Sequence, residues 1–103
     1  MPIFQTAHYA VRPEGVDDVK AAIVEFVDYV TQNEPGSHLY AAWQQADNPT
    51  HFVHLFIFDD EAAHEAHGQS AAVRQFEAVY QPYLSEGPVR FTDYVELATN
   101  QPR

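Results

Sequence analysis

Apolar residues in this chain change their spacing along the sequence in an order that few folds can accommodate. Two-residue alternation is typical of strands and predicts them over residues 3–12, 37–46, 51–58 and 89–98. A three-to-four-residue spacing is typical of helices; it begins at Val16 and recurs over Glu61–His67 and after Ser70. The order strand, helix, two strands, helix pair, strand is that of the ferredoxin-like α+β fold. We therefore expect a βαββαβ topology with a four-stranded antiparallel sheet, in a single domain over residues 1–103.

Short polar segments mark where these elements begin and end. Residues 33–36 contain a Pro-Gly pair that ends the first helix, and residues 47–50 fit the turn of a hairpin between the second and third strands. Asp60 and Ser70 stand where a side-chain oxygen can cap the helix that follows. These signals divide the chain at the same points as the change in periodicity.

The predicted strands carry large apolar side chains on both faces, although the helices of such a fold cover only one face of the sheet. In the second strand Trp43 faces away from Tyr40, and in the third strand the two alternating sets are both apolar. A second buried face requires a partner sheet, most simply from an identical subunit. We therefore predict a homodimeric α+β barrel with Trp43 in the interface.

The charge balance excludes several kinds of partner. Fifteen Asp and Glu against five Lys and Arg give a formal net charge of −10, which repels phosphate backbones and argues against nucleic-acid binding. The chain has no cysteine, so thiolate chemistry is absent. No apolar run reaches the roughly 20 residues that span a bilayer, and the N-terminal residues do not form a secretion signal. We expect a cytoplasmic protein with no membrane partner.

Histidines are the main candidates for chemistry in this sequence. His8, His54, His64 and His67 lie where strand and helix periodicity could direct them toward one apolar cavity. Imidazole titrates near neutral pH and is the natural acid or base at such a site. Burial among phenylalanines should lower the pKa of His54, so that it acts as a neutral general base.

The ordered set of segments Glu34–Tyr40, Asp47–Val53, Phe58–Ala62, His64–His67 and Ser70 resembles the antibiotic biosynthesis monooxygenase family over nearly the whole chain. That family comprises small dimeric α+β barrels and includes quinol monooxygenases and a haem-degrading branch. The resemblance implies a monooxygenase that acts on a small aromatic, quinol or polyketide-like compound with dioxygen. Members that oxidise polyketides use neither flavin, haem nor metal, so the resemblance implies no cofactor.

In those members an Asn, a Trp, a Tyr and an Arg line the pocket, and their positions match His54, Phe58, His64 and Arg74. Only Arg74 keeps the family's residue type. In the haem-degrading branch a pocket Asn matches His8 and a helical Trp matches His67, whereas the iron-ligating His falls near Glu77. A haem ligand is therefore missing.

Together these matches and the strand pattern give a predicted site. We expect His54, His64 and Arg74 to be catalytic, with Arg74 holding the oxyanion of a deprotonated phenol or enol. The substrate-binding residues are then His8, His67 and the aromatic walls Phe52, Phe56 and Phe58.

Several alternatives remain at this point. The barrel could be a non-catalytic domain that binds a small ligand or serves a stress response, or it could act as an isomerase. Three of His8, His54, His64 and His67 could also form an open metal site, although no motif such as HExxH fixes its geometry. Each histidine could equally be a hydrogen-bonded structural residue, and Arg74 could pair with Glu77 or Glu65.

Overall fold

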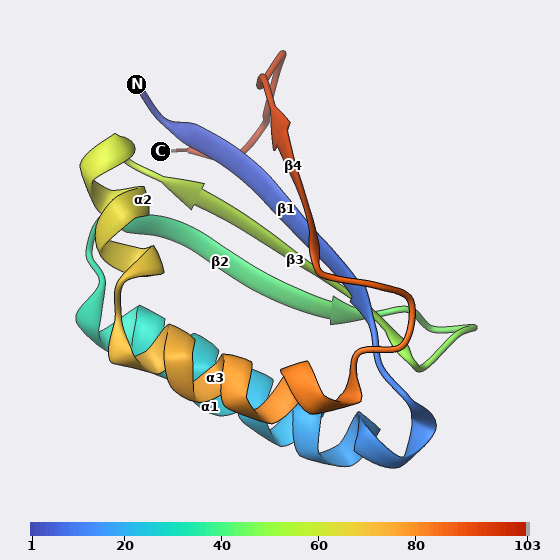
Figure 1. Ribbon diagram of the computed structural model, residues 1–103. Helices are drawn as coiled ribbons and strands as arrows, with labels where there is room; N and C mark the ends of the chain where they lie inside the picture. Colours follow the sequence, from blue (N-terminus) through green and yellow to red (C-terminus); the bar gives the residue numbers. More distant parts are fainter. Residues whose placement is uncertain (103) are drawn as a thin grey trace.

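The computed structural model describes residues 1–102 and shows one antiparallel sheet with helices on one face (Figure 1). The strand order is β2-β3-β1-β4, which is the ferredoxin-like order. The elements are β1 (Ile3–Ala10), α1 (Val16–Asn33), β2 (Ser37–Gln44), β3 (His51–Phe58), α2 (Glu61–Gly68), α3 (Ala71–Tyr80) and β4 (Arg90–Tyr94). The predicted βαββαβ topology of the α+β class is confirmed.

The predicted helix caps are present. Asp60 accepts a hydrogen bond from the Ala63 amide at 2.9 Å and begins α2, and Ser70 accepts one from the Val73 amide at 3.2 Å and begins α3. Proline and glycine at positions 35 and 36 separate α1 from β2, as the sequence indicates. None of the helices within residues 1–102 combines the length and apolar content needed to cross a membrane.

Strand β4 is shorter than the predicted strand over residues 89–98. It pairs with β1 up to the contact between Tyr94 and Phe4, and continuing that register would bring the chain past Ile3 to Pro2. Proline has no amide hydrogen to donate and β1 itself begins at Ile3, so in this register the ladder could extend by only one more residue. Val95 and Leu97 are accordingly outside the strand, at 84% and 94% exposure.

The core lies between the sheet and the helices. Pairing of β1 with β3 sets Ala7 opposite His54 and Tyr9 opposite Phe52, so Tyr9, Phe52 and His54 face the helices. The buried core side chains from the helices include Val19, Phe26, Val30, Phe76 and Tyr80. The stacked rings of Phe26 and Phe76, with centroids 5.0 Å apart, join α1 to α3 beneath the sheet.

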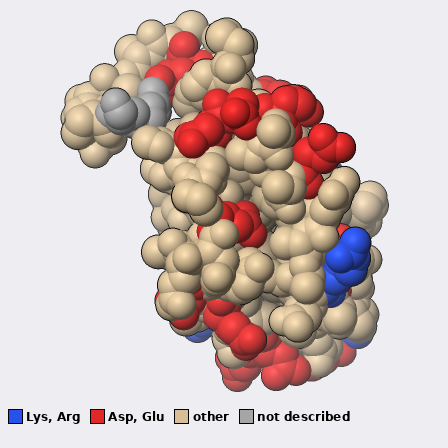
Figure 2. Space-filling view, turned by 90° about the vertical axis from the view of Figure 1, so that its left-hand side faces the viewer, with Lys and Arg blue, Asp and Glu red and all other residues tan. Residues whose placement is uncertain are grey.

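The other sheet face has no helix over it (Figure 1). Leu39 and Trp43 on β2 are 38% and 57% exposed there, in contrast to the buried helix side of β3. Elsewhere the acidic excess is spread over the surface, and Figure 2 shows several groups of Asp and Glu but few basic side chains on one face. The two-sided apolar pattern of the sequence therefore corresponds to one covered and one open face.

A close backbone approach at Gly36 sets the position of α2. The Asp59 amide donates a hydrogen bond to the Gly36 carbonyl at 2.8 Å, which holds the start of α2 against the α1–β2 connection. A Cβ added to Gly36 would lie 2.7 Å from the Ala63 Cβ, closer than carbon atoms can approach. Only glycine allows α2 to lie at this distance.

Gly36→Ala should therefore displace α2 and lower the free energy of unfolding by about 1–3 kcal/mol, the usual range for overpacking. Gly68→Ala is the matched control, because a Cβ there meets no atom within 4 Å. In the last turn of α2, alanine should leave stability unchanged or raise it by up to about 1 kcal/mol. Urea denaturation of both variants checks this; equal midpoints for the two would contradict the role of Gly36.

Candidate functional site

A cavity of about 460 Å³ lies between the helix-covered face of the sheet and the three helices. We call it the helix-side cavity. Its walls are mainly aromatic, and the rings that line it are Tyr9, Phe26, Tyr40, Phe56, Phe58, Phe76, Tyr80 and Phe91. Its volume is in the range of small-molecule sites, and its lining suits a planar apolar ligand.

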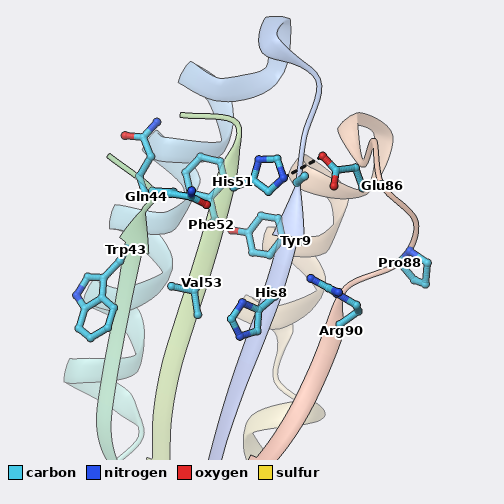
Figure 3. Close-up of a pocket in the computed structure, with 12 residues that line it drawn as sticks. His8, Tyr9, Trp43, Gln44, His51, Phe52, Val53, Glu86, Pro88 and Arg90 are labelled. Atoms are coloured by element: carbon cyan, nitrogen blue, oxygen red, sulfur yellow. Dashed lines mark ion pairs between the residues drawn. The ribbon is translucent and has the colours of Figure 1, made fainter. Parts of the chain in front are cut away.

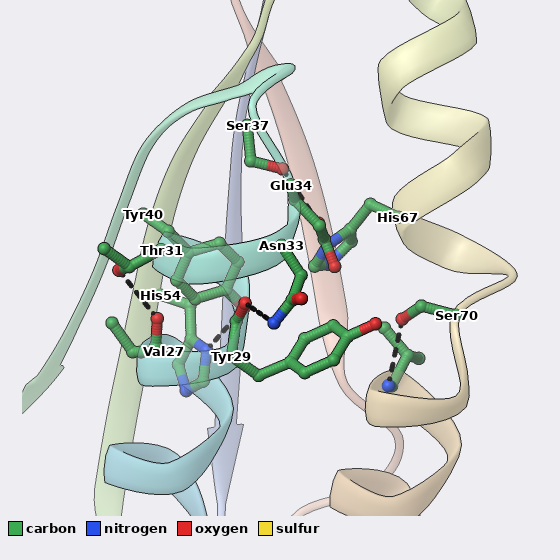
Figure 4. A network of polar contacts seen from close by, with 11 residues as sticks. Val27, Tyr29, Thr31, Asn33, Glu34, Ser37, Tyr40, His54, His67 and Ser70 are labelled. Atoms are coloured by element: carbon green, nitrogen blue, oxygen red, sulfur yellow. Dashed lines mark hydrogen bonds and ion pairs between the residues drawn. The ribbon is translucent and has the colours of Figure 1, made fainter.

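His54 lies in the wall of this cavity with both ring nitrogens in hydrogen bonds. Nε2 is 2.8 Å from the Tyr9 hydroxyl, and Nδ1 is 2.9 Å from the Tyr40 hydroxyl. Figure 4 shows the contact with Tyr40. The three residues come from the neighbouring strands β1, β3 and β2, and His54 is only 2% exposed. The Tyr9–His54–Tyr40 triad is thus a buried, preorganised polar unit in an aromatic wall.

Burial controls the charge of the triad. It lowers the pKa of His54 from its ordinary value of 6.5 to about 4, because the buried ring loses the hydration that would stabilise its charged form. Burial likewise raises the pKa of Tyr9 and of Tyr40, and the neighbouring Tyr80 adds to both shifts. At neutral pH all three groups are therefore uncharged.

Counting protons in the triad shows what it offers a ligand. A neutral imidazole has one N–H and one lone pair, so one tyrosine donates to His54 and the other accepts from it. The accepting tyrosine keeps its own hydroxyl proton, which has no partner among the described residues. Either tautomer therefore leaves one hydroxyl able to donate a hydrogen bond to a ligand oxygen.

A second polar unit adjoins the first. It consists of His67 on α2 and Glu34, which lies just beyond the end of α1 (Figure 4). The distance from His67 Nδ1 to Glu34 Oε1 is 2.7 Å, and both side chains are largely buried. Ser37 Oγ donates to the same Glu34 oxygen at 2.9 Å. The His67 ring lies 5.6 Å from the Tyr40 ring and 5.0 Å from Phe58 between centroids. We call the hydrogen-bonded residues Glu34 and His67 the Glu34–His67 dyad.

The helix-side cavity brings together most of the predicted site. His54, His64, His67, Phe56 and Phe58 all line it. His64 is about one-third exposed at the cavity edge, where its ring lies 5.1 Å from that of Phe58. Phe52 stacks on Tyr9 at 5.5 Å in the core below the cavity and does not line it.

His8 does not join this group, so the expectation that it faces the helices is wrong. It shares a face with Phe4 and Thr6 as predicted, but the register sets that face opposite the one that carries His54. His8 instead lines a second hollow of about 480 Å³ on the open face with Trp43, Val53 and Arg90 (Figure 3).

Arg74 also lies outside the helix-side cavity, which contradicts its predicted place beside a substrate oxyanion. It occupies an exposed position on α3 and donates a hydrogen bond to the Gln69 carbonyl at 2.9 Å. The inward positions of this helix are instead those of Val73, Phe76 and Tyr80. Arg74 therefore supports the α2–α3 connection.

The arrangement does not favour a metal site. Within residues 1–102, no three His, Asp or Glu side chains come close enough to hold one ion together. His54 has both ring nitrogens occupied, and His8 lies across the sheet. The histidine-ligated alternative therefore lacks the three converging ligands that it needs.

Tyr9, Tyr40 and Glu34 are site residues that the sequence prediction missed. The signal for Tyr40 was its position opposite Trp43, which places it on the helix side with His54. Glu34 gave only the signal of a helix end, and its contact with His67 spans 33 residues of sequence. Alternation places Tyr9 on the strand face opposite His8, so the expectation that His8 faces the helices assigned Tyr9 to the wrong face of the sheet.

Comparison with known proteins identifies the class. The family profile described as antibiotic biosynthesis monooxygenase matches residues 2–79, so the chain belongs to this family. The resemblance found in the sequence is thereby confirmed. Among curated proteins no significant match is found.

Solved structures with the same fold agree with this assignment. A candidate antibiotic biosynthesis monooxygenase from Bacteroides thetaiotaomicron superposes with a TM-score of 0.89 at 19% identity, covering 99% of this chain and 95% of that one. One from Nitrosomonas europaea gives 0.84 at 20% identity, with 93% and 90% covered. A Mycobacterium tuberculosis protein gives 0.83 at 21% identity, with 98% and 100% covered. At these identities the likeness establishes the fold.

The lowered pKa of His54 predicts an acid-sensitive fold. The unfolded chain binds a proton at His54 near pH 6.5 and the folded chain only near pH 4, so stability is lost as pH falls through this window. Between pH 7 and pH 5 this single group should lower the free energy of unfolding by about 2 kcal/mol.

His54→Gln removes the titration, so the difference in urea midpoint between wild type and variant should shrink on going from pH 7 to pH 5. The same comparison with Thr31→Ala, which replaces an exposed residue that has no titrating group, should give a difference that hardly changes with pH. A wild-type and His54→Gln pair with parallel pH dependence would show that His54 is not held neutral by burial.

Proposed function

We propose that this protein is a cofactor-independent monooxygenase that oxidises a small aromatic, quinol or polyketide-like compound in the helix-side cavity. The observation that carries the proposal is the Tyr9–His54–Tyr40 triad, an uncharged hydrogen-bond donor and acceptor set into an aromatic cavity. Membership of the antibiotic biosynthesis monooxygenase family supports the reaction type.

The cavity suits a planar ring that carries a phenolic or enolic oxygen. Rings of Phe56, Phe58 and Phe76 offer faces and edges for stacking, which excludes water from the bound ring. The free hydroxyl of the triad can donate to the substrate oxygen, and its hydrogen bond strengthens as negative charge develops there. This hydrogen bond therefore stabilises the transition state more than the bound neutral substrate, because negative charge develops on that oxygen only in the transition state.

The substrate supplies the electrons in this scheme. Removal of a proton leaves a delocalised carbanion, which passes one electron to dioxygen, and the two radicals combine to form a carbon–oxygen bond. The resulting peroxide anion takes back the first proton, and the hydroperoxide then loses its remaining carbon-bound proton as the O–O bond breaks and hydroxide departs. An activated CH₂ group and O₂ thus give a carbonyl group and one water, with the oxygen atoms shared between the two products.

Oxygen uptake tests this proposal directly. Wild-type protein supplied with hydroquinones and anthrone-like phenols should consume dioxygen. The double variant Tyr9→Phe, Tyr40→Phe should be slower by about 100-fold, because it removes both hydroxyl groups of the triad. Each single variant should lose less, since the remaining tyrosine still contacts His54.

Tyr29→Phe is the matched control, because Tyr29 lies on the outer side of α1 and does not line the helix-side cavity. It should retain wild-type activity. If none of these compounds causes oxygen uptake but they raise the melting temperature of the protein, the monooxygenase proposal is contradicted. The protein would then be a ligand-binding domain.

We further propose that the open sheet face pairs with that of a second copy. Leu39 and Trp43 are large apolar groups exposed on a face that no helix covers, and such a face is normally buried in an assembly. The hollow lined by His8 and Arg90 lies on the same face and would be enclosed by that partner (Figure 3). A twofold axis across the sheets would produce the dimeric barrel.

Light scattering of wild-type protein should then give twice the monomer mass of 11.7 kDa. Trp43→Glu should shift the population toward monomer, because it places a charge in the apolar contact. Val24→Glu is the control, on an exposed position of α1 far from the open face. A wild-type monomer at micromolar concentration, or equal masses for both variants, would contradict the interface.

A further inference from the structure

Two histidines are largely buried at the helix-side cavity, and they differ in what surrounds them. His54 contacts two neutral hydroxyls, whereas His67 contacts a carboxylate. A base that takes a proton inside an apolar site becomes a cation and needs a compensating charge. Of the two histidines, only His67 has a compensating negative charge, that of Glu34, at hydrogen-bond distance.

We infer that His67 is the general base of the cavity and that Glu34 positions it and compensates the imidazolium that forms. This inference rests on the proposed monooxygenase function, which it deepens by assigning the group that removes the substrate proton. The Tyr9–His54–Tyr40 triad then acts as the hydrogen-bond donor to the substrate oxygen.

The geometry of the dyad fixes the tautomer of His67. A carboxylate can only accept, so in a dyad of a carboxylate and a neutral imidazole the proton of the 2.7 Å contact lies on His67 Nδ1. The lone pair is consequently on Nε2, which has no hydrogen-bond partner among residues 1–102. A carboxylate that holds one imidazole nitrogen and leaves the other free is the arrangement used by acid–base histidines in hydrolase triads.

Surrounding rings hold His67 in this orientation. Ring centroids of Phe26, Tyr40 and Phe58 lie 5.6, 5.6 and 5.0 Å from that of His67. The ring therefore has little freedom to turn away from Glu34. Tyr40 connects the two units, because its hydroxyl is 2.9 Å from His54 Nδ1 and its ring lies 5.6 Å from that of His67; the triad and the dyad are therefore neighbours in the cavity wall.

Glu34 is unusual in having a buried oxygen without a partner. Oε1 accepts from both Ser37 and His67, but Oε2 is buried and meets no donor in the described part of the chain. A buried carboxylate with unmet hydrogen-bond capacity is stabilised by positive charge next to it. Conversion of His67 to imidazolium supplies that charge.

Other titratable groups also face the cavity, and their charges favour the same assignment. Those that line it besides His67 are Tyr9, Tyr40, His54, His64, Glu77 and Tyr80. The three tyrosines and His54 are neutral at neutral pH, because burial raises the pKa of each tyrosine and lowers that of His54. Glu77 adds a second carboxylate, which again favours a cation in the cavity. His64 has its nearest carboxylate, Glu61, at 3.8 Å on the exposed side of the helix.

The proton can be followed through the reaction. His67 Nε2 takes the acidic proton of the substrate, and the electrons of the broken bond stay on the substrate as a delocalised anion. After dioxygen has added, the imidazolium returns this proton to the terminal oxygen of the peroxide. His67 then accepts the remaining carbon-bound proton as the O–O bond breaks and transfers it to the departing hydroxide, which leaves as water.

Steady-state oxygen uptake with an anthrone-like phenol tests the role of each dyad residue. His67→Ala should lower kcat by about 100-fold with KM changed only a few-fold, as expected for loss of a general base. Added imidazole should restore much of the lost rate, which it could not do if the side chain served only to fold the protein. Glu34→Gln keeps the size and an acceptor oxygen but removes the charge, and it should lower kcat by about 10-fold or more.

The matched controls are His38→Ala and Glu65→Gln, both at exposed positions outside the helix-side cavity. They should retain wild-type kcat and KM. Wild-type turnover by His67→Ala or by Glu34→Gln would overturn the inference. A His67→Ala variant that is folded by circular dichroism, slow, and unaffected by imidazole would overturn it as well.

Binding of para-nitrophenol separates this inference from the proposed function, because it requires no turnover. At a slightly acidic pH the wild-type protein should bind the compound as its yellow phenolate, and His67→Ala and Glu34→Gln should bind it largely as the colourless phenol. If wild-type protein binds the phenolate in this way but consumes no oxygen, the role of the dyad as a base is supported and the proposed monooxygenase function is contradicted. Absence of binding, or equal ionisation by all three proteins, would overturn the dyad even if wild-type protein consumes oxygen.

Discussion

The pairing of β1 with β3 is the constraint on which the site depends. Side chains alternate strictly between the two faces of a strand, so a shift of one residue would send Tyr9 to the open face and His8 to the helices. The observed register sets Ala7 opposite His54, and Tyr9 then comes close enough for its hydroxyl to reach Nε2. Three strands thus contribute one member each to the triad.

Much of this fold could be predicted from the sequence because its signals are local. The caps at Asp60 and Ser70 and the helix from Val16 to Asn33 depend on neighbours within one or two turns. The position of His8 could not be predicted in the same way. Alternation shows that His8 shares a face with Thr6, but only the pairing of distant strands decides which face meets the helices. Arg74 was misplaced because the family match assigned it to the pocket, whereas Val73, Phe76 and Tyr80 occupy the inward side of α3.

The candidate site was predictable in part. The histidines and phenylalanines of the cavity could be found because periodicity marks an inward face. Their hydrogen-bond partners could not, because the contacts of His54 with Tyr9 and of His67 with Glu34 span 45 and 33 residues. In the sequence Glu34 was accounted for as part of the segment that ends a helix, so nothing in its local context indicated the contact with His67. The close approach at Gly36 brings α2 and the α1–β2 connection together, so a backbone requirement supports the dyad.

The charges around the helix-side cavity restrict the kind of anion that it can stabilise. Neither lysine nor arginine lines it, and Glu34 and Glu77 both lie near it. A localised anion such as a carboxylate or phosphate would be repelled there, because no fixed cation would meet it. A phenolate or enolate differs in two respects: it enters as a neutral molecule, and after ionisation its charge is spread over a ring. One hydroxyl donor and one newly formed imidazolium are then sufficient, so the cavity's own electrostatics select neutral, conjugated acids over substrates that arrive charged.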